Sequence, residues 1–430
     1  MKFLTNMSIF LMFLLCASGH DAYAKNGYER EAIVRFSKSA DSRALLAREL
    51  KAFDYRELIG GDYLLISKGS LRGDELVRHL IEKRFFDYVQ RNTTLYLASP
   101  PNDSYYSYQW SLNLIDVEGA WVNGYGGSGV GVAVIDTGIA NHPDIQWDNK
   151  RYNAYDGTGN VFDSSAWKHG VGVSGVIGAK TNNGLGIAGV CKNCAIIPVK
   201  VADEDGSISM ASLISAIYWV ASQNIKVANI SIEASGQCSV TSQPALLLAI
   251  NNAVSSGVVI VAAAGNGGGF VSDVVPASCP GVISVGAVNQ NSELASYSNM
   301  GAVLVAPGGG GGFSWPDYTA YGSGIGCPYN DVDSYFQSNT NGNFIAWVSS
   351  PASGSVPCYR YLSGTSFAAP HVAGVVAMMR AANSTLSPSA IEFILKITAT
   401  HLPSCGVSCG AGLLNAGSAV FFAKAVGITP

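Results

Sequence analysis

Four short runs of consecutive apolar residues, rich in valine and isoleucine, constrain the fold of this chain more than any other feature. Runs of this kind are typical of parallel strands that are covered on both faces. The segments 210–224 and 244–257 have the apolar periodicity of helices instead. The alternation predicts an α/β fold with a doubly wound, mostly parallel central sheet, in which functional sites lie at the carboxyl ends of the strands. The four runs are residues 129–136, 195–201, 226–232 and 257–265.

The density of charged residues divides the chain into two parts. Residues 25–100 contain 25 Asp, Glu, Lys and Arg residues among 76, whereas residues 101–430 contain 29 among 330. We therefore expect a small α+β domain over residues 25–98 and a larger α/β domain over residues 99–430, with a proline-containing boundary between them. The small domain is predicted to contain strands at 32–36, 62–67 and 93–98 and helices at 42–53 and 73–84.

The amino terminus has the pattern of a secretory signal peptide over residues 1–24. Lys2 precedes the apolar run 9–17, and the sequence Ala-Tyr-Ala at 22–24 fits a cleavage site after Ala24. The apolar run is too short to span a bilayer, and no later stretch of about 20 uninterrupted apolar residues follows it. We expect an exported protein, secreted or extracellular after any periplasmic transit, without a membrane anchor. The net charge of −4 argues against nucleic-acid partners.

Export also determines how the cysteines are interpreted. Nine cysteines minus Cys16 of the signal peptide leave eight, an even number in an oxidising compartment, which predicts disulfides. The Cys-x-x-Cys pattern at 191–194 would indicate redox or zinc chemistry in the cytosol, but no second Cys/His pair at zinc-finger spacing accompanies it. Sequence order leaves many connectivities open. Proximity along the chain favours Cys191–Cys194, Cys327–Cys358 and Cys405–Cys409.

Four polar side chains stand beside these elements at positions suited to an acyl-transfer site. Asp136 ends the first apolar run, and Asn266 lies just beyond the last one. His169 and Ser366 each precede a segment that could form a helix. A serine nucleophile needs a base, a carboxylate that orients the base and donors for the oxyanion. Each residue taken singly has an ordinary structural alternative, such as a helix cap or a turn, but the four together favour catalysis.

The sequence around these residues resembles the subtilisin-like serine proteases, from about residue 101 to residue 416. The motifs that match, in the family's order, are VIDTGI (134–139), HGVGVSG (169–175), AAAGN (262–266) and GTSFAAPHVAG (364–374). Val171 and Gly172 stand where the family's histidine motif has threonine and histidine, and neither position carries the chemistry. His142 and His371 occupy no catalytic position in the family pattern, so we interpret them as structural.

The resemblance implies a serine endopeptidase that works through an acyl-enzyme intermediate and needs no cofactor for catalysis. Ser366 is then the nucleophile, His169 the general base and acid, and Asp136 the residue that fixes the histidine tautomer. The Asn266 side chain and the Ser366 N–H would form the oxyanion hole.

The segment that would bind substrate departs further from the family pattern. The family's S-L-G-G reads SIEA at 231–234, and the resemblance implies that residues 231–233 pair with a peptide as an added strand. The primary pocket would lie between this ledge, residues 262–265 and residues 274–278, most of which are apolar or small. This favours a broad protease that prefers an apolar residue before the scissile bond, with a mild basic preference nearby if Glu233 faces the cleft. The implied substrate-binding residues are Ser231, Ile232, Glu233, Ala264 and Gly265.

By the same resemblance, residues 25–98 are a propeptide with a β-α-β-β-α-β pattern. It would assist folding, inhibit the enzyme within the same chain and be removed by self-cleavage after Ala98. An unrelated adaptor domain is the alternative. We expect a monomer that acts on proteins or peptides. A catalytically degenerate subtilase that serves as a binding protein and a non-protease esterase are the alternative functions.

The resemblance also implies a structural calcium site. Residues 101–103, Asp144 and the loop 180–187 correspond to a tight site of the family. The loop is one residue longer than usual, so the choice between Asn182 and Asn183 stays open, and a plain glycine-rich turn is the alternative. The implied ligands are the side chains of Asp103, Asp144 and Asn183 and carbonyl groups of the loop, those of Leu185 and Ile187.

Two further expectations concern the surroundings of the cleft. The family layout pairs Cys238 with Cys279 beside it. Residues 308–360 form an insertion longer than the family usually has, with 10 aromatic residues among 53 and only four charges. A floppy loop would be polar and poor in aromatics. We therefore expect an ordered flap beside the active site, tied by Cys327–Cys358, which is either an exosite for large proteins or a flap that packs only on its own domain.

Overall fold

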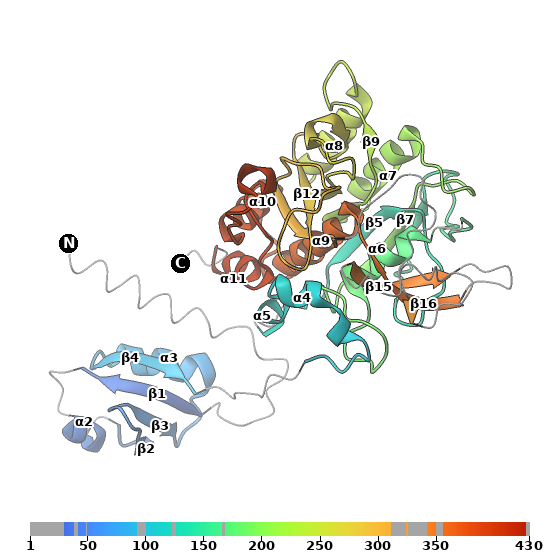
Figure 1. The fold of residues 1–430 in the computed structure, drawn as a ribbon. Coiled ribbons are helices and arrows are strands. Elements are labelled where there is room, and N and C mark those ends of the chain that lie inside the picture. The colour runs from blue at the N-terminus through green and yellow to red at the C-terminus, as the bar shows by residue number, and fades with distance from the viewer. Residues whose placement is uncertain are drawn as a thin grey trace. The chain divides into compact units, whose positions relative to one another are not determined.

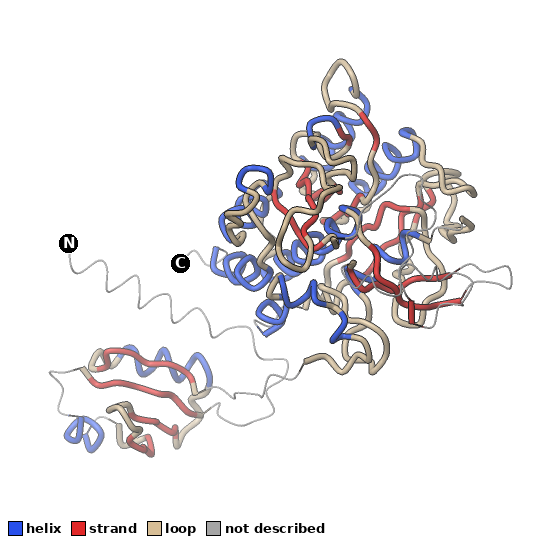
Figure 2. Tube along the Cα trace, viewed as in Figure 1, coloured by secondary structure: helices blue, strands red, loops and turns tan. Residues whose placement is uncertain are grey.

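The computed structural model describes residues 30–37, 42–48, 50–92, 100–122, 126–165, 168–310, 324–325, 342–349 and 356–426. The chain divides into two compact units, Met1–Ser99 and Pro100–Pro430, and each contains both helices and strands (Figures 1 and 2). The predicted signal peptide lies outside the described residues. Within the described ranges, no helix has the length and hydropathy needed to cross a membrane.

The first unit is a four-stranded antiparallel sheet with two helices. Its strand order is β2-β3-β1-β4, and the elements follow one another as β-α-β-β-α-β. Alternate residues of β1 face inward, where Val34 and Phe36 belong to the same apolar core as Leu76 and Leu80. The elements are β1 (Glu31–Phe36), α2 (Ser42–Arg48), β2 (Phe53–Glu57), β3 (Tyr63–Ser67), α3 (Gly73–Glu82) and β4 (Phe86–Arg91).

The expected β-α-β-β-α-β pattern contains four strands, but the positions of two of them were not predicted. The helix predicted at 42–53 ends at Arg48, and Phe53 already begins β2. The last described strand is β4, whereas the strand predicted at 93–98 lies outside the described residues. Each of the two strands buries a single residue, Phe53 in β2 and Val89 in β4. Their apolar pattern is therefore too weak to reveal a strand without the neighbouring strands.

The second unit is built on a seven-stranded sheet in which all neighbouring strands are parallel. In spatial order the strands are β13 (Leu304–Pro307), β12 (Val282–Val288), β10 (Val259–Ala263), β8 (Val227–Ile230), β5 (Gly131–Asp136), β7 (Ala195–Lys200) and β6 (Tyr152–Asn153). The four predicted runs form the adjacent strands β10, β8, β5 and β7. The predicted doubly wound, mostly parallel α/β fold is confirmed, and the sheet has three further strands, β12 and β13 beside β10 and β6 beside β7.

Helices cover both faces of this sheet (Figure 1). On one face α7 and α8 share an apolar core with Ile135 of β5, and on the other α6 and α9 share a core with Val134. Successive strand residues point to opposite faces, so β5 contributes to both cores. Most of α9 is buried, which explains why this helix is apolar all round. The helices are α6 (His169–Gly178), α7 (Met210–Ser222), α8 (Pro244–Ser255) and α9 (Thr365–Ala382).

Two small antiparallel sheets stand beside the main one. In one, β9 (Ala234–Ser235) pairs with β11 (Val274–Val275). The insertion contributes the other, with the order β14-β16-β15. β15 packs against α6, the helix that begins at His169. The strands of the insertion are β14 (Gly324–Ile325), β15 (Asn343–Ser349) and β16 (Val356–Leu362).

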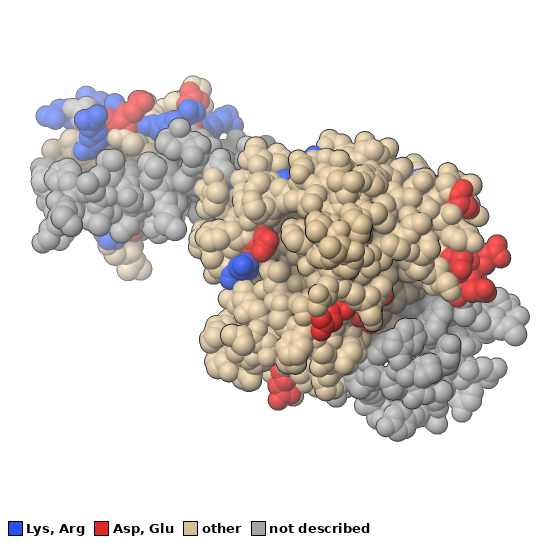
Figure 3. Space-filling model, turned by 90° about the horizontal axis from the view of Figure 1, so that it is seen from above, with Lys and Arg blue, Asp and Glu red and all other residues tan. Residues whose placement is uncertain are grey.

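The remaining helices of the second unit are peripheral to the site described below. On the face drawn in Figure 3 this unit carries few charged side chains, in keeping with its composition. The peripheral helices are α4 (Trp110–Leu114), α5 (Val117–Val122), α10 (Pro388–Thr398) and α11 (Ala416–Val426).

Three disulfides with the predicted pairing are present in the described residues. They are Cys191–Cys194, Cys238–Cys279 and Cys405–Cys409. Cys358 is also disulfide-bonded, and its predicted partner Cys327 lies outside the described residues. The Cys238–Cys279 bridge joins the chain just after β9 to the chain just after β11, so it reinforces the pairing of these two short strands.

Candidate active site

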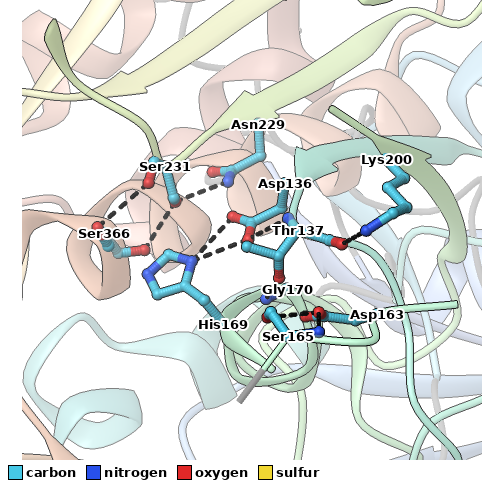
Figure 4. Close-up of polar contacts among 10 residues, drawn as sticks. All are labelled: Asp136, Thr137, Asp163, Ser165, His169, Gly170, Lys200, Asn229, Ser231 and Ser366. Atoms are coloured by element: carbon cyan, nitrogen blue, oxygen red, sulfur yellow. Dashed lines mark hydrogen bonds and ion pairs between the residues drawn. The ribbon is translucent and has the colours of Figure 1, made fainter. Parts of the chain in front are cut away.

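Three of the predicted catalytic residues lie at ends of elements that meet at one edge of the sheet. Asp136 is the last residue of β5, His169 is the first residue of α6, and Ser366 is the second residue of α9. Figure 4 shows the His169 ring between the Asp136 carboxylate and Ser366. The parallel strands bring together residues that are far apart in the sequence, as expected for this architecture.

Asp136 holds the His169 ring through its Nδ1 atom. The two carboxylate oxygens lie 2.9 and 3.1 Å from Nδ1, and the aspartate side chain is only 1% exposed, against 25% for the histidine. Burial lowers the pKa of His169, but the charge of Asp136 and the hydrogen bond to it outweigh burial and raise this pKa above its ordinary value. Because a carboxylate accepts at Nδ1, the proton resides there and Nε2 is free to act as a base.

Ser366 contacts the predicted substrate ledge. Its hydroxyl donates to the Ser231 carbonyl at 3.3 Å, and the Ser231 hydroxyl donates to the Ser366 carbonyl at 2.7 Å. The buried Asn229 side chain donates to the Ser231 hydroxyl at 2.9 Å. No hydrogen bond joins Ser366 to His169 in the structure, although both residues are described. Nucleophile–base hydrogen bonds are often long in enzymes without substrate and tighten in the complex.

The Asn266 amide is oriented by the first turn of α9. Its Oδ1 accepts hydrogen bonds from the Thr365 backbone N–H at 2.8 Å and from the Thr365 hydroxyl at 3.0 Å. The same hydroxyl accepts the Gly265 N–H at 3.1 Å. With the oxygen occupied, the Asn266 Nδ2 group is left as a donor beside the N-terminus of α9. Sequence reasoning did not single out Thr365, although it stands next to Ser366 in the same motif.

The other predicted substrate-binding residues lie near this corner with different exposures. Ile232 is half-buried against the core beneath the ledge, whereas Ala264 is fully buried. The Ala264 N–H and carbonyl are bonded to Val285 and Asn299. The Ala264 backbone therefore supports the turn at Gly265.

The Glu233 side chain turns toward the catalytic residues. Its Oε2 accepts the backbone N–H of Asn266 at 2.9 Å. The side chain is exposed, and neighbouring protein atoms raise the pKa of its carboxyl group by desolvating it.

The sequence did not predict the buried charged cluster near the Asp136–His169 pair. Lys200 ends β7 in register with Asp136, and its Nζ donates to the Thr137 carbonyl at 2.9 Å. Lys168 donates to the Ser165 carbonyl, and burial lowers the pKa of both lysines. Asp163 is fully buried, and its charge acts to raise the pKa of His169. The only feature of the sequence that could have indicated this cluster is a lysine at the end of an apolar run.

The other two histidines of this region are structural, as the sequence indicated. His371 is buried in α9, where its Nδ1 contacts the Phe367 carbonyl at 2.7 Å. His142 is buried between the Asp144 N–H and the Cys358 carbonyl, at 3.2 Å from each. Burial lowers the pKa of each histidine to about 4. Both rings are therefore neutral packing groups at physiological pH.

The predicted calcium residues are close together in the structure. Asp103 Oδ2 accepts the Asn182 N–H, and the Asp144 carboxylate accepts the Asn183 amide and the Ile187 N–H, each at 2.8 Å. Of Asn182 and Asn183, it is therefore Asn183 whose side chain contacts Asp144, although its Nδ2 rather than its oxygen faces that carboxylate. The Tyr359 hydroxyl of the insertion also donates to Asp144, at 3.3 Å.

The chemistry of this loop fits a cation. Asp103 Oδ1 is buried without a hydrogen-bond partner, and the carbonyls of Leu185 and Ile187 accept no hydrogen bond from the described residues. Burial raises the pKa of Asp144 to about 6, and the nearby Asp103 charge adds to the shift. Among the described residues no group of three or more His, Cys, Asp or Glu could hold a metal, but calcium also accepts carbonyl and amide oxygens.

Comparisons with known proteins agree with this geometry. Residues 127–413 match Peptidase_S8, the subtilase family. The chain is 33% identical over 429 residues to an extracellular protease of Xanthomonas campestris, a match that covers 88% of this chain and 68% of that protein. It is 34% identical over 315 residues to subtilisin Savinase of Lederbergia lenta, with 73% of this chain and 98% of that protein covered. Solved proteases from Pseudoalteromonas arctica align with a TM-score of 0.64 at 30% identity, over 76% of this chain and 100% of that chain.

The fold and these matches define a serine endopeptidase, a hydrolase that acts on protein or peptide substrates. The chain belongs to the subtilase family.

Proposed function

We propose that this protease cleaves peptide bonds through a catalytic triad of Asp136, His169 and Ser366. The observation that carries the proposal is the pairing of His169 Nδ1 with the buried Asp136 carboxylate at 2.9 Å. This pairing leaves Nε2 as the base on the side of the ring where Ser366 lies, in the first turn of α9. Asp136 fixes the tautomer and stabilises the imidazolium that forms during the reaction.

The reaction proceeds in two acyl-transfer steps. His169 Nε2 removes the hydroxyl proton as Ser366 Oγ attacks the scissile carbonyl carbon, and the protonated ring then gives that proton to the leaving amine. Water attacks the resulting ester with His169 again as base, and Ser366 recovers its proton. The oxyanion of each tetrahedral intermediate is stabilised by Asn266 Nδ2 and the Ser366 N–H, with help from the dipole of α9.

Substrate preference is proposed from the residues around this corner. Residues 231–233 lead from β8 into β9 and would pair with an extended peptide. The segment 274–278, which the resemblance places beside the pocket, includes Val275 and Ala277, which are buried and apolar. A large apolar side chain before the scissile bond would gain about 1.5–3 kcal/mol by burial. The proposed enzyme is therefore a broad endopeptidase with an apolar preference at that position.

The remaining proposals concern the precursor. The β-α-β-β-α-β unit would be an inhibitory propeptide, cut off after Ala98, and the mature enzyme would be secreted as a monomer. Relatives include a protein described as an extracellular protease. Calcium is proposed as a structural ion only, held by Asp103, Asp144 and carbonyl oxygens of the loop 180–187. When bound, it would neutralise the two buried carboxylates.

Labelling and digestion test the proposed chemistry together. The full chain is expressed as wild type, as Ser366→Ala and as Ser255→Ala, which changes an exposed serine of α8. We expect a serine-directed fluorophosphonate to label wild type and Ser255→Ala, both of which digest casein, and to leave Ser366→Ala unlabelled and inactive. Labelling without peptide cleavage would indicate an esterase. Neither labelling nor cleavage in wild type would indicate a degenerate binding protein.

A further inference from the structure

Glu233 brings a carboxylate into contact with the turn that carries Asn266. Besides the hydrogen bond from the Asn266 N–H at 2.9 Å, Oε2 lies against the Cα of Gly265. A Cβ added to Gly265 would be only 2.4 Å from this oxygen. The carboxylate can occupy this position because the neighbouring residue is glycine. Glu233 therefore spans the space between the ledge and the end of β10.

The negative charge at this position has no cationic partner in the described part of the chain. No ion pair of Glu233 occurs there, and Oε1 makes no hydrogen bond to the described residues. Desolvation by surrounding atoms raises the pKa of the carboxyl group, although the side chain stays exposed. A partly desolvated carboxylate without a cationic partner is stabilised by any cation that reaches it.

The position of this carboxylate identifies which substrate residue can reach it. The scissile carbonyl carbon must lie beside Ser366 Oγ, with its oxygen directed toward the Asn266 side chain. The side chain of the residue that supplies this carbonyl branches from the next atom, about 1.5 Å away. It therefore starts on the side of the Asn266 side chain, and Oε2 is hydrogen-bonded to the backbone N–H of that same residue. A side chain that extends from there along the ledge approaches Glu233.

We propose that Glu233 is a specificity-determining residue that admits lysine and arginine, alongside apolar side chains, before the scissile bond. The inference rests on the proposed triad and oxyanion site. Lysine and arginine carry aliphatic stems that can bury against apolar walls while the charged head remains at the polar rim. One pocket can thus accept apolar residues through its walls and basic residues through its walls and Glu233. Aspartate and glutamate are disfavoured by repulsion.

Charge also affects the chemical step. An ionised carboxylate beside the oxyanion disfavours the negative charge that develops there, and a substrate cation that pairs with Glu233 offsets this repulsion. The basic side chain is therefore expected to improve kcat as well as binding. A merely structural role of Glu233, as an acceptor for the Asn266 N–H, would affect basic and apolar substrates alike.

The test compares two peptides that differ only before the scissile bond, with lysine in one and methionine in the other. We measure the kcat/KM ratio of lysine to methionine peptide for the mature wild type, Glu233→Gln and Asp273→Asn. Glutamine keeps an acceptor oxygen for the Asn266 N–H and removes the charge. Asp273 is an exposed carboxylate next to β11 and serves as the matched control.

We expect the lysine-to-methionine ratio to fall about tenfold in Glu233→Gln, which corresponds to about 1.4 kcal/mol, and to stay within about twofold of wild type in Asp273→Asn. In wild type the ratio should also fall as salt screens the pair. A ratio unchanged by Glu233→Gln overturns the proposal, whatever happens to the two separate rates. Failure of the proposed function looks different, because neither peptide would then be cleaved and the fluorophosphonate would not react.

Discussion

Thr365 binds the side-chain oxygen of Asn266 through two donors, its backbone N–H at 2.8 Å and its hydroxyl at 3.0 Å. The Thr365 hydroxyl also accepts the Gly265 N–H. Thr365 is fully buried. The Thr365 hydroxyl thus fixes both the turn that precedes Asn266 and the orientation of the Asn266 side-chain amide. In the proposed reaction, this arrangement aims Nδ2 at the oxyanion before substrate arrives.

Replacement of Thr365 by valine is expected to lower kcat about tenfold and to leave KM within about twofold of wild type. Valine has the same shape but lacks the hydroxyl, so the bonds to Asn266 Oδ1 and from the Gly265 N–H are both lost. Of these, the bond that orients the Asn266 amide is worth about 1–1.5 kcal/mol. The effect falls on kcat because the oriented amide acts in the transition state. Steady-state kinetics with a peptide substrate measure the change. Thr365→Ser, which retains the hydroxyl, is the control, and wild-type kcat in the valine variant would contradict this role.

We expect kcat/KM to fall at acidic pH with an apparent pKa above the ordinary histidine pKa of about 6.5. His169 must be neutral to act as base, and its pKa is raised by Asp136. As pH falls through this raised pKa, the ring becomes protonated and activity is lost. Asp163→Asn removes another charge that raises the pKa, so its acid limb should move to lower pH. A wild-type limb below the ordinary value would argue against this electrostatic account.

Calcium is expected to stabilise the protein more at neutral than at acidic pH. The pKa of Asp144 is raised to about 6, above the unfolded value of about 3.9. Without calcium, the contribution of the Asp144 carboxyl group to the free energy of unfolding is therefore greatest below pH 4 and is lost as pH rises through about 6. Bound calcium favours the ionised carboxylate and should reverse this loss.

Thermal unfolding in chelator and in excess calcium measures the effect across this pH range. Asp144→Asn should abolish most of the calcium-dependent rise in Tm, whereas Asp205→Asn, an exposed carboxylate elsewhere, should retain it. Equal Tm values of the wild type with and without calcium would count against the site.

Removal of the Cys238–Cys279 disulfide is expected to destabilise the protein by about 2–4 kcal/mol. The bridge closes a loop with a sequence separation of 41, against 4 for Cys405–Cys409. A longer loop loses more conformational entropy in the unfolded chain when it is closed. Denaturant unfolding of the two double serine variants measures the difference. A smaller loss for the 238–279 pair than for the 405–409 pair would contradict this ranking.

Processing of the precursor is expected to depend on Ser366. If the enzyme removes its own propeptide, wild type should yield a mature chain that begins at Ser99, whereas Ser366→Ala should remain full length apart from its signal peptide. Intact-mass measurement distinguishes the two products, and Ser255→Ala is the control for correct folding. A fully processed Ser366→Ala protein would show that another protease makes the cut.

Much of the fold could be predicted because the signals are local. Continuous apolar runs identified β5, β7, β8 and β10, since strands covered on both faces have no polar side to alternate with. The polar residues at their ends indicated Asp136 and Asn266 before any spatial information was available. The short strands β2 and β4 were not predicted because each buries only one residue. They are stabilised mainly by their pairing with neighbouring strands.

The sequence by itself determined the class of fold and the residues proposed for the chemistry, because periodicity and motif order are properties of near neighbours along the chain. Only the tertiary structure decided which groups meet across long separations. Glu233 reaches the Asn266 N–H, and Tyr359 of the insertion reaches Asp144. Such contacts depend on the strand order, the turns and the packing of the whole sheet. No local pattern encodes them, since each requires two distant segments to be placed within a few ångströms of each other.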